Sequence, residues 1–81
     1  MQPLYSEITT ASNHKFRAEL NKDIITLYRD GIVIGTAKWE HHRIYDYDIN
    51  IDIHQEEFAE ILNDLSWELD TEILQLYGSM N

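Results

Sequence analysis

The middle of the chain alternates apolar and polar residues in short runs. Residues 14–20 place Phe, Ala and Leu between charged side chains, which is the period-two pattern of a half-buried strand. Residues 24–29 and 32–39 are rich in β-branched and aromatic side chains and predict two further strands. Asp30-Gly31 between them is typical of a type I′ hairpin turn, which needs positive φ at both central residues.

The turns also predict how these strands pair. A two-residue turn at Asn21-Lys22 would place Ala18 opposite Ile25 and Phe16 opposite Leu27. The turn at Asp30-Gly31 would place Leu27 opposite Ile34 and Ile25 opposite Thr36. Together the two turns predict a meander with one apolar face, formed by Phe16, Ala18, Ile25, Leu27, Ile32 and Ile34. Gly35 falls on the other face and suggests a bulge or close packing.

Residues 44–53 show the most regular alternation in the chain and predict a fourth strand. Its apolar face would carry Tyr45, Tyr47, Ile49, Ile51 and Ile53. Its other face would carry Asp46, Asp48, Asn50 and Asp52.

Apolar residues then recur at steps of three and four, which predicts an amphipathic helix over residues 54–77. Gly78 is a natural C-terminal stop. A helix of this span would be about 36 Å long and would overhang a globule of this size. We therefore expect a break near residues 66–70, with Asp70 capping a separate last helix.

These elements define an α+β fold of order ββββα, a four-stranded antiparallel meander sheet followed by a C-terminal helix. Residues 1–13 contain Pro3 and a polar run, and we interpret them as an irregular N-terminal arm. The length of 81 residues suits a single domain spanning residues 1–81. The chain has neither the pattern of a secretory signal nor a long apolar run, and we expect a cytoplasmic protein.

The charge of the chain is large and uneven. The formal net charge is −9, and all six Lys and Arg residues lie at or before Arg43. Direct binding of nucleic acid or of an anionic membrane requires a basic surface, so both are disfavoured. The expected partner is instead a protein with a basic surface.

Two rows of carboxylates follow from the predicted elements. The helix carries one at i,i+4 spacing: Glu56, Glu60, Asp64, Glu68 and Glu72. Like-charge pairs at this spacing destabilise a helix by roughly 0.2–0.5 kcal/mol each, which favours a use beyond folding. The strand carries Asp46, Asp48 and Asp52, where alternate residues lie about 6.6–6.8 Å apart. This interval is comparable to the separation of phosphates along a nucleic-acid strand, so the carboxylates could imitate them in a basic groove.

This arrangement is similar in style to small acidic phage proteins that inhibit restriction, CRISPR or uracil-glycosylase enzymes. The similarity implies a non-enzymatic inhibitor that imitates nucleic acid and blocks a nucleic-acid-binding protein. The predicted partner-binding residues are the two rows together with Trp67, which falls between the apolar and acidic stripes of the helix: Asp46, Asp48, Asp52, Glu56, Glu60, Asp64, Glu68, Glu72 and Trp67.

Two other interpretations remain open at this point. The acidic residues could simply form a solvated face that keeps the protein soluble. Alternatively, the chain could be a structural or assembly module that uses the apolar helix face and Trp67 to bind a partner or to form a homodimer.

Residues 46–58 resemble the calcium loop of EF-hand proteins. Asp46, Asp48 and Asn50 match the first three side-chain ligands, and Glu57 matches the bidentate last ligand. The sixth position, which requires Gly for a sharp turn, is Ile51 in this chain, and no entering helix is predicted. The resemblance implies a calcium-binding module as a second alternative.

No catalytic motif is evident in the sequence. The chain has no cysteine, and its three glycines are isolated rather than grouped in a phosphate-binding loop. His41 and His42 are adjacent, a spacing that matches no known metal-ligand pattern. We therefore expect no enzyme and no cofactor.

Overall fold

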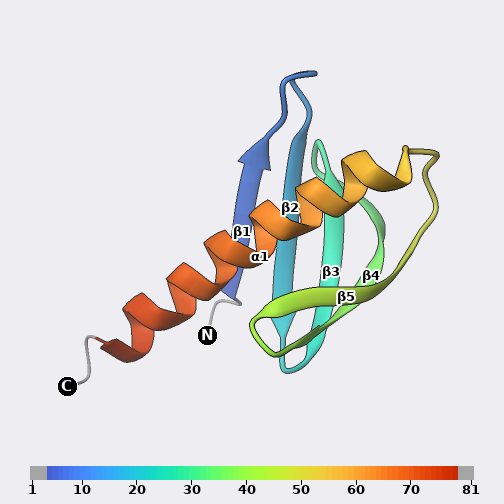
Figure 1. Cartoon of the computed structure of the whole chain (residues 1–81). Coiled ribbons are helices and arrows are strands. Elements are labelled where there is room, and N and C mark those ends of the chain that lie inside the picture. The colour runs from blue at the N-terminus through green and yellow to red at the C-terminus, as the bar shows by residue number, and fades with distance from the viewer. Residues whose placement is uncertain (1–3, 79–81) are drawn as a thin grey trace.

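A computed structural model describes residues 4–78 and shows an α+β fold with one antiparallel sheet and one helix (Figure 1). The sheet is a meander of order β1-β2-β3-β4-β5. The elements are β1 (Leu4–Thr9), β2 (Lys15–Asn21), β3 (Ile24–Arg29), β4 (Ile32–Glu40), β5 (Arg43–Ile49) and α1 (Gln55–Gly78). Within the described residues, no helix combines the length and hydrophobicity needed to cross a bilayer.

The sheet has five strands, one more than the four predicted. Leu4–Thr9 forms edge strand β1, where we expected part of an irregular arm over residues 1–13; residues 1–3 lie outside the described range. The sequence pattern hid this strand because a polar residue, Ser6, occupies its central core-facing position. Ser6 is 3% exposed, and its hydroxyl donates a hydrogen bond to the Leu65 carbonyl oxygen at 2.9 Å.

The turn at Asp30-Gly31 forms as predicted. Both residues have positive φ, 53° and 83°, and Arg29 pairs with Ile32 across the turn. The other predicted turn lies one residue later, at Lys22-Asp23, since Asn21 pairs with Ile24. This change moves the β2–β3 pairing by two residues, which leaves every side chain on its predicted face.

The predicted β3–β4 register is wrong by one residue beyond the turn. Leu27 pairs with Gly35 rather than Ile34, and Ile25 pairs with Ala37 rather than Thr36, because the register shifts between Leu27 and Tyr28. A bulge of this kind inserts one unpaired residue, here Ile34. Five of the six residues predicted for the core face are buried; the exception is Ile32, which lies at the hairpin end and is 70% exposed.

Strand β5 is shorter than predicted and also contains a bulge. The β4–β5 register shifts so that Asp46 and Tyr47 stand opposite Ala37, and Asp46 adopts a positive φ of 51°. The bulge breaks the predicted alternation, so that Ile44 rather than Tyr45 faces the core, whereas Ile49, Ile51 and Ile53 pack against the core as predicted. Ile44 is buried, and Tyr47 contacts the Phe58 ring of the helix with centroids 4.9 Å apart.

Helix α1 is continuous over 24 residues, so the break predicted near residues 66–70 is wrong. Ser66 is buried and bonded within the fold, and the carboxylate of Asp70 contacts His42 Nδ1 at 2.8 Å instead of capping a new helix. The helix begins after His54, whose ring Nδ1 accepts a hydrogen bond from the Glu56 N–H at 3.3 Å.

The hydrophobic core lies between the helix and one face of the sheet. Helix α1 crosses this face diagonally, and its C-terminal turns extend past β1 (Figure 1). The core is formed by Phe16, Ala18, Ile25, Leu27, Ile34, Ala37, Ile44, Phe58, Ile61, Leu62, Leu65 and Leu69. The other face of the sheet is left uncovered by any described element, as is common for antiparallel sheets.

Candidate functional site

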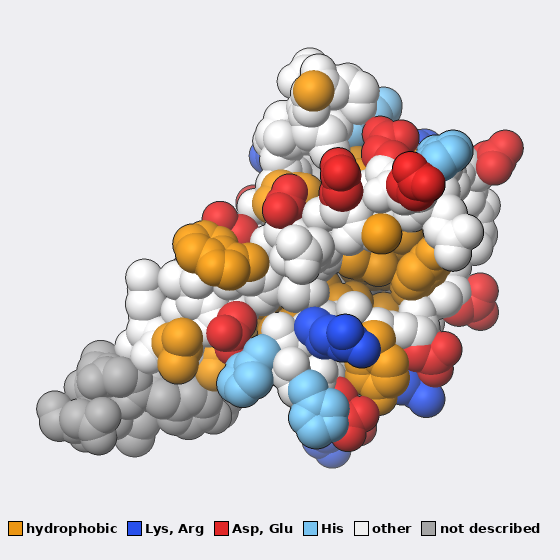
Figure 2. All heavy atoms as spheres, in the orientation of Figure 1, with side chains coloured by type: hydrophobic (Ala, Val, Ile, Leu, Met, Phe, Trp, Pro, Cys, Tyr) orange, Lys and Arg blue, Asp and Glu red, His pale blue; other side chains and the backbone are white. Residues whose placement is uncertain are grey.

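The carboxylate row of the helix is present and exposed along its whole length. Its five members are Glu56, Glu60, Asp64, Glu68 and Glu72, and Figure 2 shows acidic side chains gathered along the helix. Because four residues exceed one helical turn, each i,i+4 step rotates the row by about 40°. The row therefore winds around α1 by roughly 160°, from its outward side at Glu56 toward the sheet at Glu72.

The C-terminal end of the row meets strand β1. Glu68 and Glu72 line an open depression together with residues of that strand, Leu4, Tyr5, Ser6 and Glu7. The row is thus a spiral that links the outward face of the helix to one edge of the sheet.

None of these five carboxylates lies in an ion pair within residues 4–78. The Lys and Arg ion pairs of that range are made by strand acids: Arg17 with Glu7 and Glu19, and Lys38 with Asp46. The histidine contacts use other carboxylates, on Asp30, Glu40 and Asp70. The helix row is therefore not neutralised by ion pairs within this part of the chain.

The strand carboxylates do not join the helix row in one surface. Across the sheet, Asp48 pairs with Thr36, and Thr36 pairs with Thr26. The residues on either side of Thr26, Ile25 and Leu27, point into the core, so Thr26 and its two partners point the other way. Asp48 consequently points away from the helix, on the uncovered face of the sheet.

The other two acids of the strand row differ from Asp48. Asp46 sits in the β5 bulge and pairs with Lys38 at 3.3 Å. Asp52 follows the end of β5 and is exposed. The eight acids predicted to form one binding surface are thus divided between two faces of the molecule.

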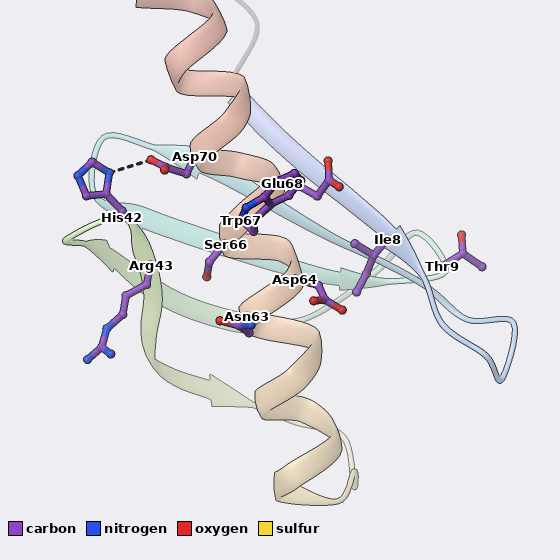
Figure 3. Close-up of a pocket in the computed structure, with 10 residues that line it drawn as sticks. All are labelled: Ile8, Thr9, His42, Arg43, Asn63, Asp64, Ser66, Trp67, Glu68 and Asp70. Atoms are coloured by element: carbon purple, nitrogen blue, oxygen red, sulfur yellow. Dashed lines mark hydrogen bonds and ion pairs between the residues drawn. The ribbon is translucent and has the colours of Figure 1, made fainter.

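Trp67 lies on the outward side of α1 with 67% of its surface exposed. Leu74, two helical turns later, is 61% exposed. Figure 3 shows Trp67 on the helix, with His42 and Arg43 on one side of the helix and Ile8 and Thr9 on the other. The helix separates these two sides, so the surface around Trp67 is convex and offers no enclosed pocket for a small molecule.

The residues that resemble a calcium loop do not surround a common point. Asp46 and Asp48 belong to β5, while Glu57 lies in the first turn of the helix. An EF-hand needs a helix before its loop, and a strand occupies that place in this fold. Within residues 4–78, no group of three or more His, Cys, Asp or Glu side chains could hold a metal ion.

The uncovered face of the sheet carries a polar and aromatic cluster that the sequence analysis missed. The Arg17 guanidinium lies 3.9 Å from the centre of the Tyr5 ring and 2.9 Å from a Glu19 carboxylate oxygen. Tyr28 donates its hydroxyl hydrogen bond to Glu19, and this bond raises the pKa of the Tyr28 hydroxyl above its usual value. The cluster joins β1, β2 and β3 on this face.

Comparison with known proteins identifies no relative of this chain. No family model, curated protein or solved structure matches it.

Proposed function

We propose that this chain is a non-enzymatic acidic protein that binds a basic surface of a partner protein. The most concrete version is an inhibitor that imitates nucleic acid and occupies the groove of a nucleic-acid-binding enzyme, as some phage-encoded inhibitors do. It would act in the cytoplasm, that of the host if the chain is phage-encoded. The observation that carries the proposal is the row of five helix carboxylates without an ion-paired cation in the described residues.

The spacing of the row supports this interpretation. Residues at i,i+4 have Cβ atoms about 5–6 Å apart, so the carboxylates form a regular series. Phosphates rise by about 3.4 Å per nucleotide along the axis of one DNA strand and also wind around it. A winding row of negative charges on a rigid helix resembles that pattern more closely than a flat one would. Such a surface would also steer a basic partner and give fast, salt-sensitive association.

The positions of the predicted binding residues lead us to expect different contributions to partner affinity. Glu60, Asp64 and Glu68 occupy the centre of the row, whereas Asp48 points away from the helix and Asp46 is paired with Lys38. A basic groove that binds the helix would contact Glu60, Asp64 and Glu68, and it would not contact Asp46 or Asp48. We therefore expect the helix acids to contribute more to partner affinity than the strand acids.

A pull-down from cell lysate tests the proposal, carried out at low and high salt, with and without competing DNA. Wild type should capture a nucleic-acid-binding protein that salt and DNA both displace. A variant with Glu60→Gln, Asp64→Asn and Glu68→Gln should lose this capture. The matched control, Asp46→Asn with Asp48→Asn, should retain it. Equal capture by the first variant and by wild type would overturn the proposal.

A second candidate function, an assembly module, is favoured by the exposure of Trp67 and Leu74. Large apolar side chains this exposed on a rigid helix are typical anchors of protein interfaces. Binding through them would resist high salt and ignore DNA. Trp67→Gln should abolish salt-resistant capture or self-association, and salt-resistant capture that this variant retained would rule out the assembly module.

A further inference from the structure

Strand β1 is an edge strand whose backbone groups on the open side can be identified from its pairing. The β1–β2 hairpin closes with the Thr10 N–H donating to the His14 carbonyl oxygen at 2.9 Å. In an antiparallel pair, residues alternate between bonding to the neighbouring strand and pointing away from it. Since Thr10 bonds inward, the N–H and C=O groups of Tyr5, Glu7 and Thr9 point outward. Within residues 4–78, these groups have no backbone partner outside the sheet.

The other edge of the sheet is protected. The outward N–H of Ile44 in β5 donates to Ser66 Oγ at 2.9 Å, so the helix satisfies it. The bulge at Asp46 further interrupts the strand. Bulges and coverage are the usual means by which proteins block unwanted strand pairing. By contrast, the β1–β2 register runs without a shift from Leu4 to Thr9, so no bulge interrupts β1 or blocks its pairing with a further strand.

Helix α1 extends over the space beside this open edge. Its C-terminal turns run past β1 (Figure 1), and about 14 Å of helix follows Leu69, the last fully buried residue of the core. Neighbouring strands are about 4.8 Å apart, so the overhang is long enough to cover a further strand. Glu68 and Glu72 line the depression along β1, and neither has an ion-paired cation in the described residues.

We propose that the open edge of β1 binds an extended basic segment of the partner as a sixth strand of the sheet. The backbone of that segment would pair with Tyr5, Glu7 and Thr9, and its Lys or Arg side chains on the helix side would meet Glu68 and Glu72. Backbone pairing gives affinity in this mode of recognition, and alternate side chains give specificity. The inference rests on the proposed function, because it specifies how the basic partner is held.

Charge identifies the occupant as a basic partner rather than a second copy of this chain. The sequence of β1, Leu4–Thr9, contains Glu7 and no Lys or Arg, so a second β1 would bring no cation to Glu68 and Glu72. Each copy also carries a formal net charge of −9, which opposes self-association. A segment with Lys or Arg at every second position would supply backbone hydrogen-bond partners for the β1 edge and cations for Glu68 and Glu72.

The test is an NMR titration of the ¹⁵N-labelled full chain with a nine-residue peptide in which Lys alternates with Thr or Val. Two control peptides isolate the two parts of the proposal. One replaces every Lys with Glu, and the other carries an N-methyl group on every backbone nitrogen so that neither of its edges can donate to a neighbouring strand. Binding of the Lys peptide should slow amide hydrogen exchange at Tyr5, Glu7 and Thr9.

A pair of variants tests the same edge from the protein side. Glu7→Pro removes an outward N–H that the sheet does not use, so the variant should fold, because proline is tolerated at such edge positions. Glu7→Ala loses the same side chain and keeps the N–H. We expect the Lys peptide to bind Glu7→Pro at least tenfold more weakly than Glu7→Ala. Should Glu7→Pro fail to fold, the N-methylated peptide makes the same comparison on wild type.

Binding that is equal for the Lys and N-methylated peptides, with no protection at Tyr5, Glu7 and Thr9, would overturn the inference. It would leave the proposed function intact, because the acidic row alone would then bind basic chains. Absence of binding, or a concentration-dependent dimer in sedimentation through the same amides, would also overturn it. If wild type captured no salt-sensitive partner in the lysate experiment while the Lys peptide still protected β1, the result would count against the proposed function instead.

Discussion

The Ser66 hydroxyl oxygen accepts a hydrogen bond from the backbone N–H of Ile44 at 2.9 Å. The same hydroxyl donates to the Leu62 carbonyl oxygen at 2.6 Å, one helical turn earlier. Ser66 is 5% exposed, so both bonds are made out of contact with water. One buried side chain thus holds the edge strand β5 against α1 and satisfies a strand N–H that has no neighbouring strand.

Ser66→Ala should lower the free energy of unfolding by about 1–3 kcal/mol, because it leaves the Ile44 N–H buried without an acceptor. Urea denaturation of both proteins measures this change. Thr71→Ala is a matched control, since the Thr71 hydroxyl also bonds a helix carbonyl, that of Trp67, but in an exposed position. The control should change stability by less than about 0.5 kcal/mol. Equal effects of the two substitutions would contradict the role assigned to Ser66.

Gly35→Ala should destabilise the sheet by roughly 1–3 kcal/mol because the β4 and β5 backbones approach each other too closely for a side chain. A Cβ at Gly35 would overlap the Asp48 carbonyl oxygen and lie 2.7 Å from the Ile49 Cα. Gly31 is the informative comparison. It has a φ of 83° and no atom near its Cβ position, so Asn, which tolerates positive φ, should be accepted there. Thermal denaturation should show Gly31→Asn near wild type and Gly35→Asn far below it.

Asp64→Lys should stabilise the fold and weaken partner binding. Asp64 has Glu60 and Glu68 at i−4 and i+4, so the substitution converts two repulsive pairs into two attractive ones. The expected gain is about 1 kcal/mol at low salt, and added salt should reduce it. Asp64→Asn should give a smaller gain. Denaturation at two salt concentrations, together with the pull-down, checks both effects; a Lys variant with undiminished capture would show that the row does not bind the partner.

Stability should fall at acidic pH partly through Asp30. The backbone N–H of Lys15 donates to Asp30 Oδ1 at 2.9 Å, and His14 lies 2.7 Å from Oδ2; these bonds hold the pKa of this carboxyl below its usual value of 3.8. A lowered carboxyl pKa means that folding favours the ionised form. Its stabilisation is therefore fully present above the usual value and is lost as the pH falls through the lowered pKa.

The substitution Asp30→Asn checks this linkage. Asn suits the positive φ of this turn position but cannot carry the charge. Melting temperatures between pH 2 and 6, spanning the ordinary carboxyl range, should show a shallower acid dependence for Asp30→Asn than for wild type. Melting curves with the same acid dependence in both proteins would refute the contribution of Asp30.

The two sheet bulges differ in what the sequence indicated, because Gly35 suggested a bulge or close packing and both occur there, whereas nothing in the sequence indicated the bulge at Asp46. Asp30-Gly31 predicted its turn correctly, because the need for positive φ is a local property of those two residues. The bulge beside Gly35 and the bulge at Asp46 changed the pairing of β4 with both its neighbours. A bulge depends on how three strands curve over a helix, and alternation along one strand does not encode that curvature.

The candidate site divides in a similar way. The spacing of the helix acids follows from the sequence, since residues at i and i+4 are neighbours on the surface of any helix. The sequence did not indicate that Asp48 would point away from the helix row, or that Glu68 and Glu72 would lie beside the open edge of β1. Those relations depend on the direction in which α1 crosses the sheet.

The sequence by itself determined the α+β class, most of the apolar core face and the unneutralised acidic row, because periodicity and charge are properties of the chain. The tertiary structure alone decided that Leu4–Thr9 is a strand and that α1 runs unbroken through Ser66. In both places a serine occupies a core position, and its hydroxyl bonds a backbone group of the opposite layer only once helix and sheet are packed together.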